Sequence, residues 1–396
     1  MIDKEVSNSF YIFIFILLNV YYKMSFLIFL FIFFAVEKCQ IIPIKYEQIS
    51  GAYNIEFKIG EGDQSKYFEI NLDLPFSFAS SYYYRKKLSK TVLTYETTQI
   101  QIEDQQKTAE HLLEHLLITS SNGNNVTVKD FHFYYVHDFL DVYDSLSLSY
   151  KSKKEEFSLL NTLYENKQIG QRKFAMMEHG FKEGTLYLGG FPNNTVNDMN
   201  NYTCKINTEY DSWGCRLTKV IVGNNVYDND DYALLQGNDR RVKVPSKFFN
   251  YLKEKYFNAY EKEGVCRYRN ILRFNFYECL YNKTENFPSF TFVFDNFSLP
   301  FEDRQLYRKV EYDNNTYKQF FIEENVIEPT KWQFGIPLFR QYPVLFDYDD
   351  SSITFFYANK GISKGKIKTM LSIVTSVLLF IGIGNAIFML LNKSSL

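Results

Sequence analysis

The sequence feature that most constrains the fold is a stretch near the C-terminus, running from Trp332 to Asp347 and continued by Ser352–Phe356. Apolar and polar residues alternate toward its end, which is the period of a β-strand with one buried face. Gly335 interrupts the stretch where a neighbouring backbone must pass closely, because glycine has no Cβ to obstruct it. The stretch therefore predicts paired strands in a mostly β protein.

The spacing of the conspicuous residues in this stretch is W-x-x-G-x-x-x-x-R-x-Y-x-x-x-F-D. In this spacing it resembles the final strands of the pepsin-like (family A1) eukaryotic aspartic proteases. Gly184–Gly190 and Trp213–Gly223 resemble the same family, and the resemblance covers roughly Tyr53 to Ala358. It implies a two-lobed pepsin-like acid-protease fold, with an N-terminal lobe over residues 40–205 and a C-terminal lobe over residues 206–358.

The family cleaves peptides with two aspartates, each on a loop that follows a strand. At the first loop Asp73 matches the family, but Leu74 and Pro75 stand where Thr and Gly belong. Proline lacks a backbone N–H and fixes φ. The loop has therefore lost a hydrogen-bond donor and conformational freedom at this position. The resemblance therefore implies a first catalytic position that is retained inside an altered loop.

The second loop departs from the family pattern at the catalytic position itself. Counting back from Pro245 places Gln236 where the second aspartate belongs, and Gly237 where the bracing threonine belongs. Asp239 could take the role only if the loop slipped by three residues. The chemistry needs two carboxyl groups that share one proton, and a neutral amide cannot exchange a proton with Asp73.

Two supporting parts of the family site are also changed. No tyrosine occurs between Gln99 and Phe131, where the family has a hairpin tyrosine that closes over substrate. Asp144–Tyr150 resembles a glycine-rich family motif but has serine at each glycine, and serine tolerates turns less freely. We therefore expect a catalytically impaired protein that binds a peptide or protein in the cleft between the lobes. The alternatives are an active aspartic endopeptidase in an acidic secretory or endosomal compartment, and a surface coat or adhesion protein.

A second motif points to different chemistry. His111, Glu114 and His115 satisfy H-x-x-E-H, a zinc-binding signature of certain metallopeptidases when it lies on a helix. In the pepsin-like frame this segment is a strand, which separates the two imidazoles by about 13 Å at four residues of strand rise. We therefore expect no metal site and no cofactor.

Both termini are apolar and indicate the secretory pathway. Residues 1–39 predict a signal peptide, beginning at Met1 or Met24, or an uncleaved signal anchor. Met370–Leu391 is long enough to span a bilayer as a helix, preceded by a juxtamembrane linker at 359–369 and followed by a cytosolic tail at 392–396. A GPI signal is the alternative. We expect a single-pass membrane protein with a luminal or extracellular ectodomain, at the cell surface or in an endosomal or vacuolar membrane.

Cysteines, sequons and charge complete the expectations. Four cysteines follow the signal region and pair most simply as Cys204–Cys215 and Cys266–Cys279, although three pairings are open. N-glycosylation sequons begin at Asn125, Asn193, Asn201, Asn282, Asn296 and Asn314. A net charge of −2 argues against a nucleic-acid partner. We expect the protein to be a monomer.

Overall fold

The structure is a computed structural model, and it describes residues 40–358 apart from short gaps. The gaps are residues 50, 61–63, 82–83, 103–104, 138–143, 151–156, 181, 193, 238, 272–273, 285–286, 296 and 302. The predicted signal segment at 1–39, the linker at 359–369, the predicted span at 370–391 and the tail at 392–396 all lie outside the described residues. Within residues 40–358, no helix has the length and apolar character needed to cross a membrane.

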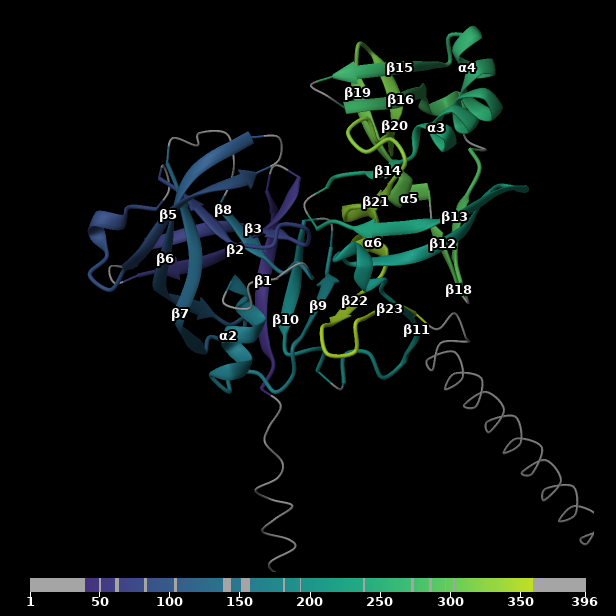
Figure 1. Cartoon of the computed structure of the whole chain (residues 1–396). Coiled ribbons are helices and arrows are strands. Elements are labelled where there is room, and N and C mark those ends of the chain that lie inside the picture. Colours follow the sequence, from purple (N-terminus) through teal and green to yellow (C-terminus); the bar gives the residue numbers. More distant parts are fainter. Residues whose placement is uncertain are drawn as a thin grey trace, which may run out of the picture.

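The described chain is mostly β, as predicted, and its strands form two large mixed sheets (Figure 1). The first sheet contains thirteen of the described strands, in the order β11-β23-β22-β9-β10-β1-β2-β3-β8-β4-β7-β6-β5. In chain order they are β1 (Ile42–Ile49), β2 (Ala52–Ile59), β3 (Gln64–Asn71), β4 (Phe78–Ser80), β5 (Leu93–Ile102), β6 (Gln105–Thr119), β7 (Asn125–Val136), β8 (Asp144–Ser147), β9 (Lys173–Glu178), β10 (Glu183–Leu188), β11 (Met199–Lys205), β22 (Val344–Asp347) and β23 (Ser352–Ala358).

The second sheet contains ten of the described strands. Its main path is β15-β16-β20-β14-β21-β13-β12-β17-β18, and β19 pairs with β20 beside that path. In chain order the strands are β12 (Gly214–Val222), β13 (Asn225–Leu235), β14 (Val242–Val244), β15 (Cys266–Ile271), β16 (Phe274–Leu280), β17 (Phe290–Phe294), β18 (Phe297–Phe301), β19 (Tyr307–Tyr312), β20 (Asn315–Glu324) and β21 (Trp332–Phe334).

The helices of the described chain are short and connect or cover strands. They are α2 (Leu159–Glu165), α3 (Ser246–Leu252), the π-helical turn η4 (Lys253–Phe257), α4 (Asn258–Lys262), α5 (Asp303–Leu306) and α6 (Ile336–Gln341), with 3-10 turns η1 (Lys86–Leu88), η3 (Thr208–Tyr210) and η5 (Tyr281–Lys283). Ser158 caps α2 by accepting a hydrogen bond from the Asn161 N–H.

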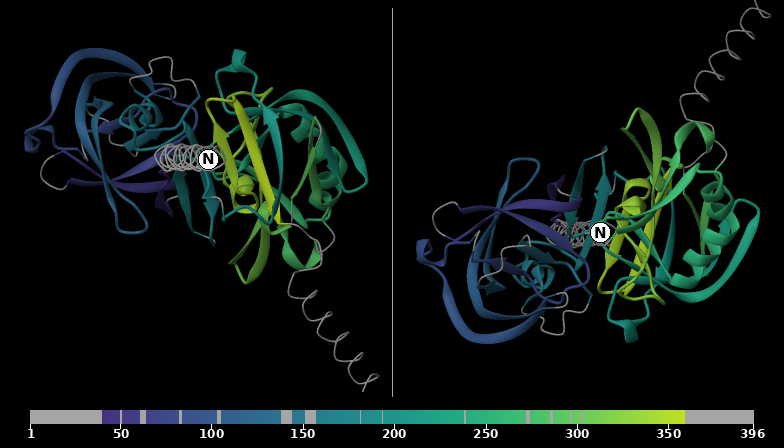
Figure 2. Two further views of the ribbon diagram at one scale, coloured as in Figure 1. Left: turned by 90° about the horizontal axis from the view of Figure 1, so that it is seen from below. Right: turned by 90° about the horizontal axis from the view of Figure 1, so that it is seen from above.

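The C-terminal strands join the first sheet although the second sheet separates them from it in sequence. β22 pairs with β9, and β23 pairs with β11. Figure 2 shows these yellow strands between the purple-blue N-terminal strands and the green strands of the second sheet. The disulfide Cys204–Cys215 also connects β11 of the first sheet to β12 of the second. Together these connections hold the two sheets against each other.

Both predicted disulfides are present. Besides Cys204–Cys215, Cys266–Cys279 joins the paired strands β15 and β16. Most of the buried apolar side chains of both sheets belong to one continuous core, whose largest fully buried members include Trp213 and Trp332. In β23 the side chains of Ile353 and Phe355 are buried, and Thr354 between them is partly exposed, as expected of a strand with one core-facing side.

Candidate functional site

The first predicted catalytic position, Asp73, lies on the loop that follows β3. The Asn71 side-chain oxygen accepts hydrogen bonds from the N–H groups of Asp73 and Leu74, both at 2.8 Å. The Ser149 hydroxyl donates to the Asp73 carbonyl at 2.9 Å, and the Ser147 hydroxyl donates to the Leu74 carbonyl at 2.5 Å. The serines at the expected glycine positions thus hold this loop, and Asp73 itself is half-buried.

The residues after Asp73 are apolar and pack on a small separate hydrophobic cluster. Leu74 and Phe76 pack against this cluster, and the Phe76 ring meets the Tyr134 ring edge-on with centroids 5.1 Å apart. The same cluster contains Ile100 and Ile102 from the end of β5. The end of the β5–β6 hairpin and the altered loop therefore pack on the same cluster.

The second predicted position, Gln236, directly follows β13. Its N–H donates to the Phe334 carbonyl at 2.8 Å, which extends the parallel pairing of β13 with β21. A Cβ placed on the next residue, Gly237, would lie 3.3 Å from the Ile70 carbonyl oxygen and 3.5 Å from Leu72 Cγ. The fold therefore brings the Gln236–Gly237 backbone against the end of β3, immediately before Asp73.

Asp239 forms contacts within its own loop, and its side chain is 8% exposed. One carboxylate oxygen accepts the Arg241 N–H at 3.1 Å, and the other forms an ion pair with Lys243 Nζ at 2.5 Å. The Asp239 carbonyl accepts the Ile336 N–H at 2.7 Å. Both carboxylate oxygens are thus used to hold the loop.

A buried ion pair lies behind this loop. Arg241 Nε is 3.6 Å from Glu323 Oε2, and the guanidinium lies 4.0 Å from the centre of the Phe276 ring. Burial, with a smaller contribution from the nearby Asp239 charge, raises the pKa of Glu323 to about 7, although the charges of Arg241 and Lys243 act in the opposite direction. Burial also lowers the pKa of Arg241. The pair anchors the loop at the cost of removing charges from water.

A buried carboxyl group in the first sheet was missed by the sequence reasoning, which treated Asp144 only as part of a turn motif. Asp144 is 1% exposed, and one of its oxygens accepts the Ser80 N–H at 2.8 Å. Its other oxygen has no hydrogen-bond partner among the described residues. Burial raises the pKa of Asp144 to about 7, so the side chain is protonated in mildly acidic solution. No sequence signal marks this burial except the apolar residues around it.

The H-x-x-E-H segment lies on β6, so its residues do not share one face of a helix. The His111 ring is buried, and its Nε2 lies 2.9 Å from Nδ1 of His132. Glu114 is buried on the same strand, where hydroxyl groups surround it, while His115 is exposed. The described residues contain no group of three or more side chains placed to hold a metal ion.

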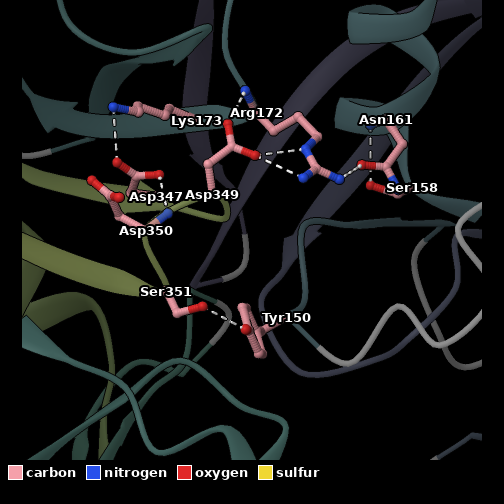
Figure 3. A network of polar contacts seen from close by, with 9 residues as sticks. All are labelled: Tyr150, Ser158, Asn161, Arg172, Lys173, Asp347, Asp349, Asp350 and Ser351. Atoms are coloured by element: carbon pink, nitrogen blue, oxygen red, sulfur yellow. Dashed lines mark hydrogen bonds and ion pairs between the residues drawn. The ribbon is translucent and has the colours of Figure 1, made fainter.

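Figure 3 shows how the end of the C-terminal stretch is bound to the first sheet. Lys173 Nζ forms an ion pair with Asp347 at 2.8 Å, and the Arg172 guanidinium binds Asp349 at 2.7 and 2.8 Å. The Tyr150 hydroxyl lies 2.8 Å from the Ser351 hydroxyl. These contacts are structural, and they fix the turn between β22 and β23 against the loops of the first sheet.

The chain was compared with protein families, curated proteins and solved structures. No family model matches it, and no curated protein matches it. Among solved structures it is similar to basic 7S globulin from soybean, with a TM-score of 0.66 and 13% identity over 80% of this chain and 95% of that chain. The two proteins share a fold. At this identity the likeness extends to the fold alone.

The predicted membership of the pepsin-like aspartic proteases is therefore wrong. A solved structure with the same fold is a soybean globulin, and no family model supports the assignment. The C-terminal pattern has a structural cause. Gly335 must lack a Cβ because one would lie 2.1 Å from the Asp239 carbonyl oxygen, Arg340 donates to Gln48 at 2.8 Å, and Asp347 pairs with Lys173. These residues reflect packing between elements and say nothing about catalysis.

Proposed function

We propose that the described chain is a non-catalytic binding protein that holds an extended peptide or protein segment in a cleft between its two sheets. In this proposal each sheet forms one lobe of a pepsin-like architecture, and the meeting point of the β3 and β13 ends lies at the base of the cleft. The return of β22 and β23 to the first sheet supports this arrangement. The proposal concerns architecture and makes no claim of membership in a protease family.

The observation that carries the proposal is the identity of the residue beside the end of β3. The Gln236–Gly237 backbone lies there, and Gln236 supplies an amide where a proton-sharing couple would need a carboxyl group. An amide can donate and accept hydrogen bonds, so with the Asp73 carboxylate it suits recognition of a peptide backbone. It cannot act as an acid or a base at ordinary pH.

The second supporting observation is that Asp239 is already engaged. Its carboxylate binds Lys243 and the Arg241 N–H, so moving it toward Asp73 would break an ion pair and leave Lys243 without this partner. Removing one partner of a mostly buried pair costs about 3 kcal/mol or more. A slipped loop with Asp239 as the second acid is therefore unfavourable.

Peptide display tests the proposal. Random twelve-residue peptides are selected on the immobilised full-length protein, and the affinity of each selected peptide is measured by fluorescence polarisation. Asp73→Ala and Gln236→Ala should each weaken binding about tenfold, as loss of a charged or buried hydrogen bond does. Asp228→Asn, an exposed change on β13, is the matched control. If neither substitution changes the affinity, the peptides bind at another site, and the proposal is overturned.

We also propose that the protein is a single-pass membrane protein of the secretory pathway. Among the described sequon residues, Asn125, Asn201, Asn282 and Asn314 are exposed, as attachment of a glycan requires. The two disulfides fit an oxidising compartment. Glycosidase treatment should increase gel mobility, and the protein should stay with membranes in alkaline carbonate. Release by carbonate without any mobility shift would contradict this placement.

A further inference from the structure

β5 lies at the end of the first sheet, in the part of Figure 1 away from the second sheet. One edge of β5 pairs with β6, and no described strand pairs with its other edge. The strand is ten residues long, and its first five side chains, Leu93 to Thr97, are all exposed. An edge of this kind presents backbone N–H and C=O groups that can pair with another strand.

The surface beside the open edge is both apolar and basic. Leu88, Leu93 and Tyr95 are exposed by 56, 57 and 58%. Arg85, Lys87 and Lys90 are also exposed, and the sequence from Arg85 to Thr97 contains one acidic residue, the exposed Glu96, so that basic residues are in excess. These six residues and the open edge of β5 are called the β5 surface below. Glu110 on the neighbouring strand does not neutralise it, because Glu110 pairs with Lys86 and His137.

The segment that leads into β5 is held by a buried carboxylate. Glu114 is 1% exposed and accepts hydrogen bonds from the hydroxyl groups of Tyr84, Ser89 and Thr91, the first at 3.2 Å. The His115 N–H donates to the same carboxylate at 2.8 Å. The basic residues therefore project from an ordered backbone. A surface that is already ordered loses less conformational entropy when a partner binds.

We propose that the β5 surface binds an extended segment of a partner protein, rich in acidic and apolar residues, that adds to the sheet as a strand beside β5. When a segment binds as an added strand, its backbone hydrogen bonds contribute affinity whatever its sequence. Its alternate side chains, which contact the neighbouring surface, determine which sequences are preferred. The exposed leucines and Tyr95 match apolar side chains of the segment, and the three basic residues match its carboxylates.

Charge favours a different protein over a second copy of this chain. A second copy would bring the same basic residues to the interface and supply no excess of carboxylates to match them, whereas an acidic segment does. The site is also separate from the proposed cleft. Ile100 and Ile102, which pack near the Asp73 loop, lie at the opposite end of β5 from Leu93.

Labelled twelve-residue peptides test this inference on the full-length protein by fluorescence polarisation. One peptide alternates valine with glutamate, a second replaces every glutamate with lysine, and a third carries the acidic sequence with N-methyl groups on alternate residues. We expect the acidic peptide to bind, and the other two to bind at least about tenfold more weakly, because charge matching and backbone pairing are both required.

Variants of the protein locate the site. The double variant Lys87→Glu with Lys90→Glu should weaken the acidic peptide about tenfold and strengthen the lysine peptide, because reversing two charges exchanges attraction for repulsion. The control, Lys182→Glu with Lys262→Glu, makes the same charge change at exposed positions elsewhere and should leave the affinity unchanged. Equal thermal midpoints of the two variants establish that both are folded.

Three results would overturn the inference. The first is equal binding of the acidic and lysine peptides, and the second is no binding of the acidic peptide at any concentration. The third is a concentration-dependent dimer, detected by sedimentation, that the Lys87→Glu and Lys90→Glu change alters while peptide binding is absent. That result would assign the surface to a second copy of the chain.

Discussion

At the scale of single residues, the site is defined by what each polar group already contacts. Asp239 is 8% exposed and binds Lys243 and the Arg241 N–H, so its carboxylate serves the loop. The Gln236–Gly237 backbone lies beside the end of β3, which leads into the half-buried Asp73. A carboxylate that forms an ion pair within its own loop helps to hold that loop in place. A catalytic acid, in contrast, usually lowers the stability of the protein.

Removing the Asp239 carboxylate should therefore destabilise the protein. We expect Asp239→Ala to lower the free energy of unfolding by about 3 kcal/mol, because it removes a mostly buried ion pair with Lys243 and the acceptor of the Arg241 N–H. Urea denaturation measures the change. Glu311→Ala removes a carboxylate from the exposed Lys309–Glu311 pair and should leave the free energy of unfolding nearly unchanged, because water and salt screen an exposed pair. Unchanged or increased stability of the Asp239 variant would contradict the structural role.

At the scale of elements, the start of α6 is fitted to the second loop. The N–H groups of Gly335 and Ile336 donate to the carbonyls of Arg241 and Asp239, at 3.2 and 2.7 Å. A side chain at Gly335 would enter this contact, since its Cβ would lie 2.1 Å from one carbonyl oxygen and 2.6 Å from the other. The loop that carries Gln236 is thus positioned by a glycine about one hundred residues later in the chain.

Adding one methyl group at Gly335 should disturb this contact. We expect Gly335→Ala to lower the free energy of unfolding by about 3 kcal/mol, because rigid backbone atoms must move to accept the Cβ. Gly180→Ala is the matched control, since a Cβ there meets nothing within 4 Å, and it should be neutral or slightly stabilising. Equal denaturation midpoints for the two variants would show that the β21–α6 junction does not determine the loop.

The sequence predicted much at this scale, and its failures have physical reasons. The pattern of the C-terminal stretch predicted β22 and β23, and the pairing of the nearest cysteines predicted both disulfides. Short α6 was not foreseen, because Ile336–Gln341 is too short to display a helical period. The family assignment failed because residues such as Gly335 and Asp347 are required by packing, and packing requirements are shared by chains with different chemistry.

At the scale of the whole molecule, buried carboxyl groups recur in both sheets. Burial raises the pKa of Asp144, Glu178 and Glu323 to about 7. In an unfolded chain the pKa of such carboxyl groups is about 4. Between these values the folded protein binds more protons than the unfolded chain, so its free energy of unfolding falls as the pH rises. This contribution is fully present below about pH 4 and lost above about pH 7.

These three groups should make the protein more stable at pH 5 than at pH 8. Urea denaturation at the two pH values measures the difference. Asp144→Asn removes one of the groups and should reduce the difference, because an amide does not titrate. Asp228→Asn changes an exposed aspartate and should leave the difference unchanged. A protein that is more stable at pH 8, or a difference unaffected by Asp144→Asn, would contradict the assignment.

The central proposal is that, among the residues that the structure describes, no pair of carboxyl groups shares a proton at the meeting point of the two sheets. The most direct measurement is the rate of hydrolysis of a quenched peptide library by the full-length protein between pH 3 and pH 6, with and without pepstatin. Asp73→Ala in the same preparation gives the background rate. We predict equal rates for the two proteins and no effect of pepstatin. Pepstatin-sensitive hydrolysis that disappears in the Asp73→Ala variant would show an active aspartic site and contradict the account.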